Sequence, residues 1–102
     1  YGSRQEILQA VKSLVKDVLD KKVNLGDLDE EKFSRYLYTK DTPDPELLIR
    51  TSGETRLSNF LLWQSSYTEF YFTKTYWPDF KIKDLQEAII YYQARVRRFG
   101  AI

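Results

Sequence analysis

The sequence has 102 residues and a formal net charge of +1, so it can form one domain at most and lacks the strong basic field of a typical nucleic-acid binder. It contains no cysteine and no histidine, which excludes disulfides, thiolate or imidazole metal sites and a histidine general base. Any catalysis must therefore use carboxylates, hydroxyls, arginines or a metal held by oxygen.

The first segment has the pattern of an amphipathic helix over about residues 4–21. Its apolar residues recur at helical spacing and form one stripe that is expected to pack against the rest of the fold: Ile7, Leu8, Val11, Leu14, Val15, Val18 and Leu19. Ser3 and Glu6 have the spacing of a capping box, in which each side chain binds a free backbone N–H group at the start of the helix. The Lys21-Lys22 pair is expected to mark its end.

A second, short helix is expected after the turn that contains Gly26, and Asp29 can cap its first turn. A loop with Pro43 and Pro45 follows, because proline disfavours helix at the residue before it. The next apolar run, residues 47–49, is bounded by turn residues and predicts a strand that is buried on both faces.

The loop after this strand concentrates groups that suit an anion. Seven of its nine residues supply two guanidiniums, three hydroxyls, a carboxylate and a glycine: Arg50, Thr51, Ser52, Gly53, Glu54, Arg56 and Ser58. It leaves the carboxyl end of the strand, where open α/β sheets bind ligands, and paired guanidiniums bind phosphate oxygens well. Two surface arginines without a ligand are the alternative interpretation. Ser58 also occupies the N-cap position of a helix expected over about residues 59–66, whose free N–H groups would favour a phosphate.

Two further elements are expected before the chain ends. Residues 69–73 are rich in β-forming side chains and predict a second strand, and residues 77–80 predict a turn. A last helix over about residues 83–99 has one apolar face, arginines near its end and Gly100 just beyond it. Two strands and three or four helices are too few for a covered parallel sheet. Residues 1–102 are therefore expected to be a single partial domain of a larger α/β protein.

One ordered string, RTSGETRLSNFLLWQSSYTEFYF from Arg50 onward, closely resembles the C-terminal signature of the cis-prenyltransferases, as does the later WPDF at Trp77. The bacterial members of this family are the undecaprenyl diphosphate synthases. The resemblance extends from YGSRQEI at the first residue to RRFG near the last. It implies that the chain is the C-terminal half of an α/β domain with a mostly parallel sheet flanked by helices.

The same resemblance implies an activity. Members of the family are transferases that condense isopentenyl diphosphate onto an allylic diphosphate, such as farnesyl diphosphate, with each new double bond formed cis. The product implied is a long polyprenyl diphosphate of the undecaprenyl type, the lipid carrier of cell-wall synthesis.

The resemblance also assigns roles to individual residues. The matching arginines and serine of the family hold the diphosphate of isopentenyl diphosphate, which implies this role for Arg50, Arg56 and Ser58, with Leu57 contributing its backbone. Glu54 lies between the two arginines, where an inward-pointing carboxylate would repel phosphate. Orientation of a guanidinium is therefore favoured for Glu54 over direct catalysis.

Two further matches imply a magnesium site and a contact across a dimer interface. The residues that match Glu69 help to hold Mg²⁺ together with an aspartate in the first half of the family's domain, and Mg²⁺ commonly combines one or two carboxylates with substrate phosphates. Arg98 and Gly100 match an R-x-G element that contacts substrate phosphate from across the interface of a homodimer. An arginine that stabilises the negative end of a helix explains the place of Arg98 equally well.

No catalytic residue is expected in this chain, because the aspartate-bearing DGNGR-type loop of the family has no counterpart here. The chain alone is therefore expected to be inactive and to supply the isopentenyl diphosphate site and a dimer interface. The apolar runs are only a few residues long, so neither a secretory signal nor a transmembrane segment is expected. A cytoplasmic location is expected, with peripheral membrane association left open and a product that associates with membrane.

Two alternatives remain at this point. One is a non-catalytic partner subunit, and the other is an unrelated phosphate-binding α/β interaction module. Partner subunits of the family tend to lose the loop arginines, whereas Arg50 and Arg56 are both present together with Glu54 and Ser58. This retention favours the enzyme.

Overall fold

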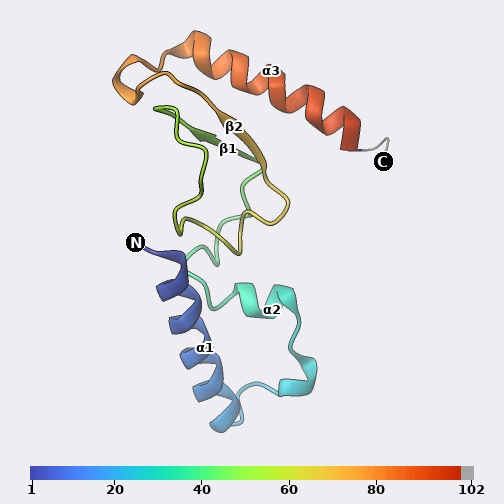
Figure 1. Ribbon diagram of the computed structural model, residues 1–102. Coiled ribbons are helices and arrows are strands. Elements are labelled where there is room, and N and C mark those ends of the chain that lie inside the picture. Colours follow the sequence, from blue (N-terminus) through green and yellow to red (C-terminus); the bar gives the residue numbers. More distant parts are fainter. Residues whose placement is uncertain (100–102) are drawn as a thin grey trace. The chain divides into compact units, whose positions relative to one another are not determined.

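The computed structural model describes the backbone of residues 1–99 and the side chains of residues 1–95 (Figure 1). Its helices and strands are α1 (Ser3–Leu19), α2 (Glu30–Ser34), β1 (Leu47–Arg50), β2 (Glu69–Phe72) and α3 (Ile82–Phe99), with 3₁₀ helices at Leu25–Asp27 and Trp77–Asp79. The expected α/β class is confirmed. The chain divides into two compact units, one made of Tyr1–Asp44 and Leu57–Ser66, the other of Pro45–Arg56 and the chain from Tyr67 onward.

Helix α1 begins and ends close to the predicted residues. Its end is a Schellman motif, in which the N–H of Lys21 donates to the carbonyl of Val18 (3.1 Å) and the N–H of Lys22 donates to that of Asp17 (2.9 Å). Lys21 has the left-handed φ of 61° that this motif requires. The lysine pair therefore marks the helix end as predicted, although glycine is the usual residue at this position.

The apolar stripe of α1 is only partly covered in its unit. Ala10 and Leu14 are buried. By contrast, four large apolar side chains on the same helix are exposed: Leu8, Val11, Val15 and Leu19. Packing of the stripe is therefore observed for only part of it in the described residues, and for the rest it stays a prediction.

The capping-box prediction for Ser3 and Glu6 is also wrong. The N-cap of α1 is Gly2, which makes no side-chain cap hydrogen bond. Ser3 and Glu6 are instead completely buried and bind groups from the segment Leu57–Ser66 and from the loop after α2. These partners lie 32 to 59 residues away in the sequence, so a local motif could not identify them.

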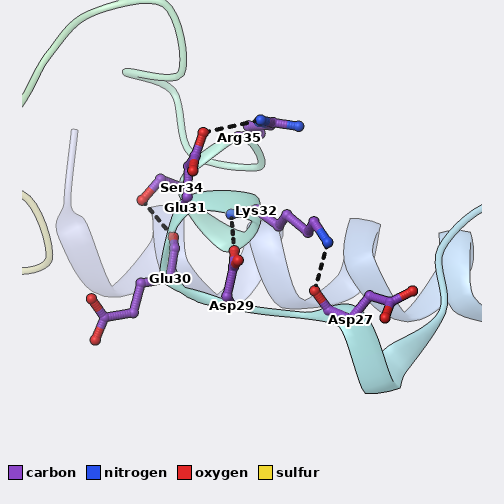
Figure 2. A network of polar contacts seen from close by, with 7 residues as sticks. All are labelled: Asp27, Asp29, Glu30, Glu31, Lys32, Ser34 and Arg35. Atoms are coloured by element: carbon purple, nitrogen blue, oxygen red, sulfur yellow. Dashed lines mark hydrogen bonds and ion pairs between the residues drawn. The ribbon is translucent and has the colours of Figure 1, made fainter.

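Helix α2 forms where expected, and Asp29 caps it by accepting a hydrogen bond of 2.8 Å from the N–H of Lys32 (Figure 2). Lys32 Nζ in turn donates to the carbonyl of Asp27 (2.8 Å), and Arg35 forms an i,i+4 ion pair with Glu31 (3.1 Å). These contacts lie within a few residues of one another, which explains why the sequence alone predicted this helix.

The second unit is built on two parallel strands. Leu47 pairs with Glu69 and Arg50 pairs with Phe72, so both strands have their amino ends on one edge and their carboxyl ends on the other. Helix α3 packs on β2 (Figure 1). Ala88 is fully buried, and the rings of Tyr71 and Tyr91 are 5.3 Å apart. All four residues of β1 are half-buried, so the prediction of a strand buried on both faces is not met in this chain.

The segment Leu57–Ser66 contradicts the prediction of a helix over residues 59–66. It forms bends and turns, and Ser58, Asn59 and Leu61 have left-handed φ angles of 51°, 65° and 49°. Side chains from this segment complete the core of the first unit: the rings of Phe33 and Trp63 lie 4.9 Å apart. Tertiary contacts have overridden the helical propensity of the run.

Among the described residues, none of the helices has the length and apolar character that a membrane span requires.

Candidate anion-binding site

The loop that follows β1 is held at the carboxyl edge of the strand pair. Ser52 and Gly53 have φ angles of 66° and 74°, which turn the chain sharply just after Arg50. The N–H of Ser52 donates to the carbonyl of Thr75 (2.8 Å), and the N–H of Gly53 donates to that of Thr73 (2.9 Å). The loop is therefore fastened to the segment after β2, and these two N–H groups are already used.

The turn brings Arg50 and Arg56 together. Arg50 Nη1 donates a hydrogen bond to the backbone carbonyl of Arg56. The guanidinium of Arg56 lies 2.5 Å from a carboxylate oxygen of Glu54, in an ion pair whose side chains are 70% and 42% exposed. An exposed pair of this kind contributes about 0–1 kcal/mol, so a phosphate can compete for Arg56 at low cost. The expected contact between Glu54 and a guanidinium is present.

Leu57 and Ser58 belong to the first unit, whereas Arg50, Glu54 and Arg56 belong to the second. Leu57 is half-buried and Ser58 is exposed. Because no helix begins at Ser58, the predicted phosphate site at a helix N-terminus is wrong. A contribution of Ser58 to anion binding would have to come from its hydroxyl and from the backbone of the turn.

The first turn of α1 holds the Ser58 turn through Asn59, a residue that the sequence analysis did not single out. The N–H of Ser3 donates to the Asn59 carbonyl (2.7 Å), and the N–H of Arg4 donates to Asn59 Oδ1 (2.8 Å). The N–H of Leu62 donates to Ser3 Oγ (2.9 Å). One signal was available, since asparagine directly after Ser58 is among the residues that most readily adopt the left-handed conformation.

Glu6 anchors the other end of the same segment. Its carboxylate accepts hydrogen bonds from Gln64 Nε2 (3.2 and 3.3 Å), from the N–H of Tyr38 (2.8 Å) and from the hydroxyl of Tyr1. Gln64 Nε2 also donates to Thr39 Oγ1 (3.0 Å). The pKa of Tyr1 is raised, because its hydroxyl is partly desolvated and donates to the Glu6 carboxylate. Glu6 therefore joins three parts of the first unit.

Glu69, the predicted magnesium ligand, lies at the edge opposite to Arg50. It pairs with Leu47 at the amino end of β1, three residues or about 10 Å along the strand from Arg50. Its carboxylate is 3.3 Å from Arg95 Nε in an ion pair. A second carboxylate, that of Glu46, accepts a hydrogen bond of 2.8 Å from the Tyr92 hydroxyl close by.

The charges of both carboxylates act on Tyr92. Its pKa is raised chiefly by the hydrogen bond to Glu46, then by partial desolvation and by the negative charges of Glu46 and Glu69. Among the described residues, no three carboxylates, histidines or cysteines group closely enough to hold a metal ion. Glu69 thus fits Mg²⁺ only as one contributor to a shared site.

Two residues of the predicted site lie partly or wholly outside the described part of the chain. The backbone of Arg98 lies in the last turn of α3, but its side chain is outside the described part, and Gly100 lies outside it altogether.

Comparison with known proteins decides the family. The undecaprenyl diphosphate synthase family model matches residues 1–100. The chain belongs to this prenyltransferase family. The resemblance to the cis-prenyltransferases is thereby confirmed, and the alternative of an unrelated phosphate-binding module is excluded.

Relatives in this prenyltransferase family are similar over almost the whole chain. An isoprenyl transferase of Heliobacterium mobile is 58% identical over 102 residues, which are 100% of this chain and 39% of that protein. A tritrans,polycis-undecaprenyl-diphosphate synthase (geranylgeranyl-diphosphate specific) of Thermoplasma acidophilum is 57% identical over 100 residues, 98% of this chain and 39% of that protein. The chain thus spans about two fifths of the length of these relatives.

Two solved structures of prenyl diphosphate synthases share the fold. Lavandulyl diphosphate synthase from Lavandula x intermedia, in complex with dimethylallyl diphosphate, superposes with a TM-score of 0.86 at 45% identity, over 90% of this chain and 40% of that one. A probable undecaprenyl diphosphate synthase from Campylobacter jejuni gives a TM-score of 0.76 at 38% identity, over 98% and 44% of the two chains.

Proposed function

We propose that this chain is a single partial domain that provides the isopentenyl diphosphate site of a cis-prenyltransferase. The complete enzyme would condense isopentenyl diphosphate onto an allylic diphosphate, such as farnesyl diphosphate, to form a long polyprenyl diphosphate of the undecaprenyl type. The observation that carries this proposal is the loop at the carboxyl end of β1, where Arg50 and Arg56 are joined by a hydrogen bond and Arg56 is paired with Glu54. A related synthase is described in complex with dimethylallyl diphosphate, which supports a diphosphate as the ligand.

The loop suits a diphosphate for physical reasons. Two planar guanidiniums offer several parallel N–H donors to the phosphate oxygens, and such charge-assisted bonds are about twice as strong as neutral ones. Arg50 is fixed by its bond to the backbone of Arg56, so it loses less rotamer freedom when it binds. Glu54 would orient Arg56 from the side away from the ligand. Leu57, through its backbone, and Ser58, through its hydroxyl, would add further contacts.

Binding at this loop would contribute to catalysis by position. The diphosphate of isopentenyl diphosphate would be held so that its double bond lies within reach of the allylic carbon, and positioning of two reactants can lower a barrier by several kcal/mol. No residue of this chain is proposed as the catalytic acid or base. We therefore expect no turnover from this chain alone, and elongation of farnesyl diphosphate by it would contradict the proposal.

Mg²⁺ would be shared between this chain and groups outside it. Glu69 would supply one carboxylate, which fits an ion that commonly takes one or two carboxylates together with substrate phosphates. When bound, Mg²⁺ supplies positive charge that stabilises a departing diphosphate. Arg95 would have to release or share Glu69 at that point, because the two side chains form an ion pair.

We propose a homodimer, in which Arg98 and Gly100 contact substrate phosphate across the interface. The enzyme would lie in the cytoplasm, and its product would associate with membrane. A non-catalytic partner subunit is less well supported, because the loop retains both arginines, Glu54 and Ser58.

Isothermal titration of the chain with isopentenyl diphosphate tests the proposal. Arg50→Ala removes a charged hydrogen-bond donor, and such bonds contribute about 1.5–3 kcal/mol, so affinity should fall about 10- to 100-fold. Arg35→Ala is the control, since it removes an arginine that lies outside the loop, at the end of α2, where it pairs with Glu31. Equal loss of affinity in both variants, or none in either, would contradict the proposed site.

A further inference from the structure

The N-terminus of α1 is occupied by a segment more than fifty residues away in sequence. The first N–H groups of a helix have no partner within the helix and must be satisfied by other groups. Here the N–H of Ser3 donates to the carbonyl of Asn59, and the N–H of Arg4 donates to its side-chain Oδ1. Asn59 therefore caps α1 from outside with both its backbone and its side chain.

The cap acts on a turn whose conformation needs support. Ser58, Asn59 and Leu61 all have left-handed φ angles, which cost roughly 1–2 kcal/mol for residues other than glycine and less for asparagine. A turn with three such residues persists only where surrounding contacts fix it.

Further bonds from the same turn of α1 supply this support. The N–H of Leu62 donates to Ser3 Oγ, and Gln64 Nε2 donates to the carboxylate of Glu6. Ser3 and Glu6 are completely buried. One helical turn thus holds the segment at three successive points, and the first of them, Asn59, is the direct neighbour of Ser58.

We propose that Asn59 is a positioning residue for Ser58: by capping α1 it fixes the backbone of Ser58, whose hydroxyl is proposed to bind the diphosphate. This inference rests on the proposed function and extends it, because Asn59 itself would not contact the ligand. It also explains why the N-terminus of α1 is not an anion site, since its leading N–H groups are bound to Asn59.

Three substitutions at Asn59 separate the contributions of the cap and of the backbone. Asn59→Ala loses the cap and disfavours the left-handed conformation. Asn59→Gly loses the cap but keeps that conformation accessible, and Asn59→Asp keeps both. Asn24→Ala is the matched control, because Asn24 also accepts a capping bond, from the N–H of Gly26 (3.0 Å), but belongs to the 3₁₀ helix Leu25–Asp27.

Two measurements on the 102-residue chain are combined. Amide hydrogen exchange at Arg4 and the three-bond H–N–Cα–H coupling of Ser58 report the cap and the turn, and isothermal titration reports affinity for isopentenyl diphosphate. We expect Asn59→Ala to speed exchange at Arg4 and to weaken binding by about tenfold, in line with a lost cap. Asn59→Gly should weaken binding less. Asn59→Asp should keep slow exchange at Arg4 and bind more tightly than Asn59→Ala, although its added negative charge beside Ser58 opposes the diphosphate. Asn24→Ala should remain within about twofold of the original chain.

The outcomes distinguish this inference from the proposed function. If Asn59→Ala releases the Arg4 amide while the affinity stays unchanged, the inference is wrong and the site stands. If Asn59→Asp binds as weakly as Asn59→Ala, the inference is also wrong, even where the alanine variant is unfolded by circular dichroism. If the original chain binds no isopentenyl diphosphate, the proposed function fails, and the positioning role fails with it.

Discussion

At the scale of single residues, left-handed backbone conformations shape both the candidate site and its support. Ser52 and Gly53 turn the chain after Arg50, and Ser58 and Asn59 turn it again before the core of the first unit. Ser52, Gly53 and Asn59 are each fixed by hydrogen bonds to a remote segment. The conformation of the candidate anion-binding loop therefore depends on contacts outside it.

Lys21 provides a simple test of how much such conformations cost. Lys21→Gly should raise the free energy of unfolding by about 0.5–1 kcal/mol, because glycine adopts the left-handed C-terminal position of α1 without strain but loses more entropy on folding. The melting temperature should rise by about 2–8 °C. Lys22→Gly is the control and should give no rise, since only Lys21 of this pair has a positive φ. An unchanged or lower melting temperature for Lys21→Gly would contradict the left-handed conformation at Lys21.

At the scale of elements, hydrogen bonds from tyrosines join helices to their neighbours. The hydroxyl of Tyr36, just after α2, donates to Asp17 Oδ2 of α1 (2.7 Å). That of Tyr92 in α3 donates to Glu46, the residue before β1. The pKa of Tyr36 is raised by this hydrogen bond, by partial desolvation and by the charge of Asp17.

The raised pKa of Tyr36 makes stability depend on pH in a defined direction. The folded-state pKa lies above the unfolded value of about 10, so this contribution is fully present below pH 10 and is lost as the pH rises through the folded-state value. Tyr36→Phe should therefore lower the urea midpoint of unfolding at pH 8. Above pH 10, the midpoint of this variant should fall less with rising pH than that of the original chain. Tyr67→Phe, at a tyrosine that is 90% exposed, should leave the pH profile unchanged. If the urea midpoints of Tyr36→Phe and of the original chain fell in parallel above pH 10, the titration of Tyr36 would not contribute to stability and the prediction would be wrong.

Elements fixed by neighbours in sequence could be predicted from the sequence, and those fixed at a distance could not. The cap of Asp29 on α2 and the end of α1 at Lys21 depend on residues within five positions, and both predictions are confirmed. Ser3 was recognised as a polar group at a helix start, but its partner is 59 residues away. The helix predicted over residues 59–66 failed for the same reason, because α1 holds that run in another conformation.

At the scale of the whole molecule, the chain carries more apolar surface than its own contacts cover. Side chains of α1 such as Leu8 and Leu19, and of α3 such as Ile82 and Ile90, are exposed. The chain spans about two fifths of its relatives' length. That it is a partial domain, as its small number of strands predicts, stays a prediction. The sequence motif from Arg50 onward was sufficient to predict the family, because it can be recognised from consecutive side chains without knowledge of contacts between residues remote in sequence.

The central claim is that the loop from Arg50 to Ser58 binds the diphosphate of isopentenyl diphosphate. A nuclear magnetic resonance titration of the ¹⁵N-labelled chain tests it most directly, because it reports each backbone amide and each arginine Nε–H group separately. We expect the largest chemical-shift changes at the backbone amides of the loop and at the Nε–H groups of Arg50 and Arg56, and no change at the Nε–H group of Arg35. Shifts centred on Arg35 and α2, or a loop that is unmoved at saturating ligand, would contradict it.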